Sequence, residues 1–223
     1  MLILSMESTA KSVSCAVCRD TGLLGQNFQN NGLTHSRTLL SMTESLLLNL
    51  NISLNDIELI AVSRGPGSFT GVRIGISAAK GLAWSLDIPI CGVSTLEAMA
   101  YQAHQSGVVI CPVMDARHAQ VYNALFDWAD GVPVRLCEDR AISLEELATG
   151  LRAFGKPCLL IGDGAAISQE HLVCAGIQCS IAHPLLRWQT AYGVALAALR
   201  SEPVASSMLE PSYLRPPQAE PHV

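Results

Sequence analysis

Apolar runs of strand length alternate with helical patterns along the first hundred residues. In chain order the pattern predicts strands at 2–6, 12–18 and 23–29, a helix at 36–50, a strand at 57–63, a helix at 72–86, a strand at 89–93 and a helix from 94 to about 104. Three consecutive strands predict an antiparallel meander, and the later strand–helix–strand order predicts right-handed parallel crossovers. The first half therefore predicts a mixed α/β sheet flanked by helices.

A second group of elements begins near Gly107. It predicts strands at 108–114, 120–126 and 158–161, helices from 143 to about 154 and over 188–200, and an extended proline-rich tail. Ser143 and Glu146 have the spacing of a capping box at the start of a helix. We therefore expect two lobes, residues 1–106 and 107–223.

Composition narrows the class of protein. Hydrophobic residues make up 49% of the 223 residues, and no apolar run reaches the roughly 20 residues of a membrane span. The first residues lack the pattern of a signal peptide, and eight cysteines scattered among apolar runs are typical of reduced thiols. These features predict a cytoplasmic protein with no membrane contact. A net charge of −5 and only three lysines argue against direct binding of nucleic acid.

The segment from Ser63 to Gly75 is too rich in glycine for regular structure at its start. Gly65, Gly67 and Gly71 permit close approach of the backbone, and Ser68 or Thr70 can cap the helix that follows. Such a loop suits either an anion or tight packing against another segment, and the two interpretations have equal weight from the residues alone. The spacing of a Walker motif is absent.

The string RGPGSFTGVRIG at 64–75 resembles the signature of the TsaB (YeaZ) family and of its larger paralogues, the TsaD family. Further segments that fit TsaB lie at 34–40, 92–98, 114–117 and 211–215. The resemblance covers residues 1 to about 215 and implies a two-lobed ASKHA fold, like that of actin-like ATPases, sugar kinases and Hsp70. It implies a non-catalytic subunit beside a TsaD-like catalytic subunit and a TsaE-like ATPase, which transfer threonylcarbamoyl to the adenosine next to the anticodon of tRNA. ATP and metal are then expected on the partner subunits, and tRNA contact only through the complex.

The candidate nucleotide-proximal loops look incomplete for catalysis. No two histidines are four residues apart, so the metal-binding pair of TsaD-like chains is missing. Actin-like ATPases carry an aspartate where Glu7 stands, and the longer side chain would displace a tightly octahedral Mg²⁺. We expect vestigial phosphate loops and no catalytic residue or bound metal; the positions are Glu7, Ser8, Thr9, Gly65, Gly67, Ser68, Gly162 and Gly164. The plainer alternatives are an exposed strand end at Glu7 that accepts hydrogen bonds from Ser8 or Thr9, and a simple turn at 162–164.

The helices at 36–50 and 72–86 are candidates for a partner interface. Leucines of the first spread beyond one narrow stripe, and the second carries small residues at four-residue spacing, which lets helices approach closely. The expected interface residues are Leu39, Leu46, Leu47, Leu50, Gly71, Gly75, Ala79 and Leu82. The same surface would allow a homodimer when the chain is alone. The alternative is a helix pair buried within one chain.

Two other functions stay open at this point. One is a stand-alone ASKHA-fold small-molecule kinase or ATPase, which requires intact phosphate loops in both lobes. The other is a peptidase, although the sequence has neither a G-x-S-x-G elbow nor an H-E-x-x-H zinc helix. Nucleotide binding by the isolated chain separates the first of these from a scaffold subunit.

Overall fold

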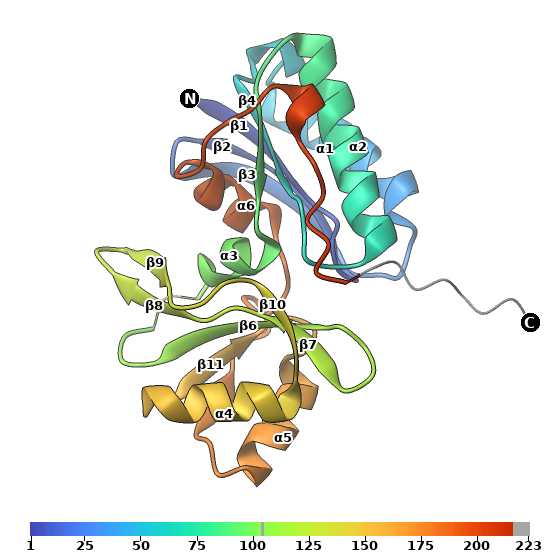
Figure 1. Cartoon of the computed structure of the whole chain (residues 1–223). Helices are drawn as coiled ribbons and strands as arrows, with labels where there is room; N and C mark the ends of the chain where they lie inside the picture. Colours follow the sequence, from blue (N-terminus) through green and yellow to red (C-terminus); the bar gives the residue numbers. More distant parts are fainter. Residues whose placement is uncertain (104, 216–223) are drawn as a thin grey trace, which may run out of the picture.

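A computed structural model describes residues 1–103 and 105–215, which form two lobes, each built on a mixed sheet (Figure 1). The first sheet has the strand order β3-β2-β1-β4-β5. Its strands are β1 (Leu2–Glu7), β2 (Val13–Arg19), β3 (Gly22–Gln29), β4 (Leu59–Ser63) and β5 (Ile90–Val93). Strands β1, β2 and β3 are antiparallel neighbours, and β4 and β5 continue in parallel from β1. The predicted meander and parallel crossovers are confirmed.

Helices cover both faces of the first sheet. Helices α1 (His35–Leu50) and α2 (Phe69–Leu86) lie on one face, where Leu4, Met6 and Val62 enter a shared apolar cluster. The opposite face packs on α6 (Ala191–Ala198), next to Ile3 and Ala61. The alternation of side chains along the strands produces the two separate cores. Helix α2 begins earlier than the pattern predicted.

The second sheet has the order β10-β7-β6-β11-β12, with β8 beside β6 and β9 beside β8. Its elements are β6 (Val109–Asp115), β7 (Gln120–Asn123), β8 (Phe126–Ala129), β9 (Val132–Arg135), β10 (Arg140–Ser143), α4 (Leu144–Phe154), β11 (Cys158–Ile161), α5 (Ala165–Cys174) and β12 (Cys179–Ile181). The predicted strand at 120–126 is divided between β7 and β8. The capping box of Ser143 and Glu146 is confirmed, since both of its hydrogen bonds are present.

Helix α3 (Thr95–Ala100) lies between the lobes (Figure 1). Its Ala98 joins the core under α6, whereas Leu96 and Met99 pack into the second lobe. Ser94 caps α3 by accepting from the Glu97 N–H. The Glu97 side chain does not reach back to complete a capping box and instead forms an ion pair with Arg135 of β9 (3.0 Å). The helix ends at Ala100, earlier than the predicted end near 104, and residue 104 itself lies outside the described residues.

The boundary predicted at residue 107 does not hold to the end of the chain. Helix α6 packs on β1, β2 and β4, and the short helix η2 (Ser206–Met208) contacts α2. Residues 191–209 therefore lie on the first lobe, although 107–223 were predicted to form the second. The small apolar helix α6 has almost no polar face, so its pattern could not show which sheet it covers.

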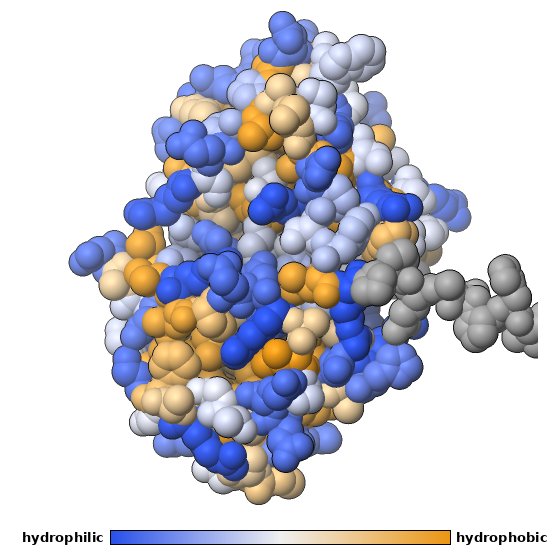
Figure 2. All heavy atoms as spheres, viewed as in Figure 1, coloured by the Kyte–Doolittle hydropathy of each residue, from blue (hydrophilic) through white to orange (hydrophobic). Residues whose placement is uncertain are grey.

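The surface is mixed in character. Figure 2 shows apolar side chains gathered on the lower left of this face, over the second lobe. Val134 and Leu136 are among the exposed apolar residues of the chain. Among the helices that the structure describes, none has the length and apolar character needed to cross a bilayer.

Candidate functional site: an interlobe cleft beside a helix groove

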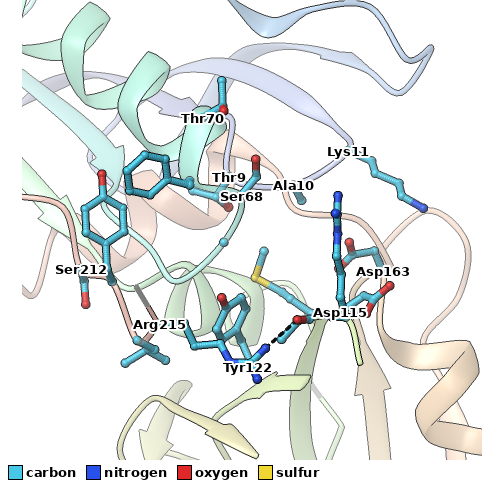
Figure 3. A pocket seen from close by; sticks show the side chains of 17 residues that line it. Thr9, Ala10, Lys11, Ser68, Thr70, Asp115, Tyr122, Asp163, Ser212 and Arg215 are labelled. Atoms are coloured by element: carbon cyan, nitrogen blue, oxygen red, sulfur yellow. Dashed lines mark hydrogen bonds between the residues drawn. The ribbon is translucent and has the colours of Figure 1, made fainter. Parts of the chain in front are cut away.

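A cleft of about 490 Å³ opens between the lobes (Figure 3). The first lobe contributes the β1–β2 loop at 9–11 and the start of α2, and the second contributes the end of β6 and Asp163. The C-terminal segment closes one side. The two predicted phosphate loops and the glycine-rich loop thus converge at one place; the charged lining residues are Lys11, Asp115, Arg117, Asp163 and Arg215.

The glycine-rich loop packs tightly against the β1–β2 loop. Ser68 is the N-cap of α2: its hydroxyl oxygen accepts from Gly71 N–H (3.3 Å), and its own N–H donates to the Thr9 carbonyl (2.7 Å). A methyl group on Gly67 would overlap Thr9, and one on Gly71 would overlap the Ser8 carbonyl. The sequence left open whether this loop binds an anion or packs against another segment. These contacts favour close packing.

Glu7 lies beneath the cleft and does not line it. It is 1% exposed, and its carboxylate accepts from the N–H and the hydroxyl of Thr9 (both 2.6 Å) and from the Ser63 hydroxyl. Burial raises the pKa of Glu7 above its usual value. The expected exposed strand end is therefore wrong, while its hydrogen bonding to Thr9 is confirmed. With both carboxylate oxygens engaged, this position does not suit a hydrated Mg²⁺ ion.

The second loop faces the cleft through its middle residue. Asp163 lines the cavity and accepts from Gln189 Nε2 (3.3 Å), and burial raises the pKa of its carboxyl. Gly162 has a φ of +115° and packs against the Val113 carbonyl, and Gly164 lies over the end of β6. Gly162 and Gly164 thus hold the turn, and the side chain that reaches the cleft belongs to the residue between them, which the sequence analysis did not select.

The tail crosses the mouth of the cleft, a role that the sequence did not reveal. Ser212 N–H donates to the Arg64 carbonyl (2.7 Å), at a point where a side chain on Gly65 would overlap Ser212. Tyr213 stacks on Phe69 with ring centroids 4.8 Å apart. Arg215 then donates to the Ala116 carbonyl in the second lobe (2.9 Å). The tail at 212–215 therefore links the lobes, and the likeness of 211–215 to the family was its only sequence signal.

Most of the predicted interface residues are not available to a partner. Buried in the chain itself are Leu39, Leu46, Leu47, Gly71, Gly75 and Ala79. The leucines and Ala79 enter the core under the sheet face, and Gly75 packs against the Ser8 hydroxyl. Leu50 and Leu82 are only partly exposed. These positions fit the alternative of an internal helix pair, because side chains that fill the core present no surface to another chain.

The outer face of the same helices is apolar and open. A groove of about 620 Å³ runs between α1 and α2, lined by Leu40, Phe69, Ile74 and Ala78 among others. Leu40 is 50% exposed. Farther along the two helices, Leu48 is 74% exposed and Trp84 is 80% exposed. Of the charged side chains, the groove lining includes Arg73, whose guanidinium lies 3.8 Å from the Phe69 ring centroid.

Within the described residues, no group of three or more His, Cys, Asp or Glu side chains is placed to hold a metal ion. Cys15 and Cys18 are both buried and free, and they enter the cores on opposite faces of the first sheet, because residues three apart on a strand point to opposite faces.

Two lobes with mixed sheets, their loops facing a shared cleft, define the ASKHA class of folds. The family model for TsaD, tRNA N6-adenosine threonylcarbamoyltransferase, matches residues 31–220. The Bacillus subtilis tRNA threonylcarbamoyladenosine biosynthesis protein TsaB is 32% identical over 170 residues, which cover 76% of this chain and 74% of the relative. The chain belongs to the TsaB (YeaZ) family.

Solved structures agree with this assignment. YeaZ from Pseudomonas aeruginosa is 25% identical, with a TM-score of 0.80, over 95% of this chain and 99% of that one. The activator of 2-hydroxyisocaproyl-CoA dehydratase from Clostridium difficile has a TM-score of 0.50 at 8% identity, over 90% of this chain and 94% of that one. At that identity the second likeness concerns the fold alone.

Proposed function

We propose that this chain is a non-catalytic subunit of the system that makes threonylcarbamoyladenosine in tRNAs reading ANN codons. In this role it binds a TsaD-like catalytic subunit in the cytoplasm, and a TsaE-like ATPase joins the complex. The family to which the chain belongs supports the pathway, since its relatives are named as biosynthesis proteins for this modification.

The observation that carries the docking role is the open apolar face of α1 and α2. Exposed apolar surface on a helix pair marks a site for another protein when it forms one continuous patch. Leu40 lines the groove between the two helices, and Leu48 and Trp84 are exposed farther along α1 and α2. Large aromatic side chains often carry much of the binding energy at protein interfaces. We place the TsaD-like partner here, with its own helices completing a four-helix arrangement. A second copy can use the same face when the partner is absent.

The non-catalytic role rests on the loop that contains Glu7. A carboxylate that must hold magnesium and its water needs free oxygens directed into the cleft. Glu7 is instead buried and occupied by Thr9 and Ser63. We therefore assign ATP and metal to the partner subunits, and contact with tRNA to the assembled complex.

The test is binding of the purified chain to the TsaD-like protein of the same organism, measured by calorimetry. A Leu48→Lys variant should lose at least about tenfold in affinity, because the ammonium group must be desolvated in an apolar contact. Leu185→Lys is the matched control, since Leu185 is also largely exposed but lies in the loop before α6. Both variants should melt like the wild type. Unchanged binding by Leu48→Lys and by Trp84→Ala would rule out this face.

A further inference from the structure

The edges of the two sheets are protected to different degrees. Free edge strands can pair with other chains, and proteins usually block them with charge, proline, shortness or a covering segment. Here β5 is covered, because Ile90 and Val204 exchange backbone hydrogen bonds (2.8 and 3.0 Å). Strand β9 carries Pro133 and Arg135, β10 carries Arg140, and β12 has three residues. Each of these edges therefore has a recognisable protection.

Strand β3 lacks charge, proline, shortness and a covering strand, and the protection that it does have is a bulge at Leu24. It is the longest strand that the structure describes, with eight residues, and on its outer side no described strand pairs with it. Residues 21–36 contain no Asp, Glu, Lys or Arg, and the strand contains no proline. A register shift between Val17 and Cys18 leaves Leu24 without a partner, so the regular part of the edge is 25–29. Phe28 in this part is 39% exposed.

The 25–29 segment is fixed in position by its neighbours. Asn27 donates from Nδ2 to the Met42 carbonyl of α1 (3.0 Å), and its carbonyl accepts from the Ser14 hydroxyl (2.9 Å). Gln26 Oε1 accepts from Tyr192 N–H of α6 (3.0 Å). A strand held in this way loses little conformational freedom when another strand pairs with it.

We propose that residues 25–29 pair antiparallel with the same segment of a second copy of this chain. A two-fold axis across the strand places each copy of the segment opposite itself, so any charge within it would meet a like charge. The uncharged segment meets this condition, whereas the β9 and β10 edges would bring arginines together. The two first-lobe sheets would then form one continuous sheet. This contact is separate from the helix groove and leaves that face open to a partner.

A pairing of five residues per copy makes a small interface, so we expect association only at high protein concentration. Sedimentation velocity of the full chain over a wide concentration range measures it. Because a second copy can also use the helix face, Phe28→Lys is tested in the Leu48→Lys background. There it should weaken the association at least about tenfold, because the two lysines lie close across the axis. Phe28→Thr is the matched control: it keeps a neutral residue that favours strands, and it should weaken association less than lysine does.

The two surfaces are separated by repeating the measurement with Leu48→Lys. We expect this variant to retain the β3 association, and Phe28→Lys to bind the TsaD-like partner normally. The proposal is overturned if Leu48→Lys stays monomeric at every concentration, or if the double variant Leu48→Lys, Phe28→Lys associates like Leu48→Lys alone. Melting curves establish that each variant is folded. Loss of partner binding in Leu48→Lys tests the helix face independently.

Discussion

The inner and outer faces of the α1–α2 pair contain similar residues in different surroundings. Leu46 and Ala79 on the inner face are buried against the first sheet. Leu48 and Trp84 on the outer face are largely exposed. Composition is therefore a poor guide to partner contact, because the sheet takes up one apolar face before any other chain can reach it. The surface left for docking is what remains after the core is filled.

The inner face also fixes the loop that ends β1. Gly71 and Gly75 stand where a side chain would overlap Ser8, which lets α2 approach the β1–β2 loop. Ser8 Oγ donates to the Gly71 carbonyl (2.9 Å). Small residues that looked suited to a partner helix thus serve a contact within the chain. Glu7, one residue earlier, is enclosed by the same packing.

The sharpest test of the comparison places one charge on each face of α2. Ala79→Arg should prevent folding, because Ala79 is 0% exposed and an arginine there adds bulk and an unpaired charge to the core. Ser77→Arg, on the exposed side of the same helix, should fold normally. Circular dichroism and thermal melting measure the difference. A cooperative melt of Ala79→Arg near that of the wild type would contradict the assignment of the inner face.

A milder test removes one leucine from each face of α1. Leu46→Ala should lower the free energy of unfolding by about 2–5 kcal/mol, the range for a buried leucine. Leu48→Ala should change it by less than about 0.5 kcal/mol, because that side chain is already in water. Urea denaturation of both variants gives the two values. Equal losses would show that the faces do not differ in burial.

The sequence could supply the elements of the first lobe because each has a strong local signal. The buried strands have short apolar runs, and Ser68 and Ser143 are good caps at the starts of α2 and α4. Helix α5 and strand β12 were missed: α5 has almost no amphipathic pattern, and β12 has only three residues. The position of α6 depends on contacts between distant parts of the chain, which local patterns do not contain.

The site was only partly predictable for the same reason. The loops at 7–9, 65–68 and 162–164 could be found from glycines and the family likeness, and the structure brings them to one cleft. Their side-chain directions could not be found. Whether Glu7 faces the cleft depends on Ser63, 56 residues away, and the link from Arg215 to Ala116 spans 99 residues. Contacts over such distances leave no periodic signal in one sequence.

The smallest expected effect is the pH dependence of folding stability that buried Glu7, at the end of β1, contributes. Burial raises the pKa of Glu7 above its ordinary value of 4.5, so the folded chain holds this proton more tightly than the unfolded chain. Stability from this group is full at pH values below 4.5 and is lost as pH rises through the folded pKa. Glu7→Gln stays neutral and can keep acceptor contacts to Thr9, so it removes this loss.

The measurement is urea unfolding of both proteins over roughly pH 4 to pH 8, a range that begins below the ordinary glutamate pKa of 4.5. All other titratable groups are common to both proteins, so the difference between the two profiles reports mainly on Glu7. The stability of the wild type relative to Glu7→Gln should fall as pH rises. Parallel profiles would mean that the carboxyl ionises as readily in the folded chain as in the unfolded one. The loop beneath the inner face would then be more open to water than its packing indicates.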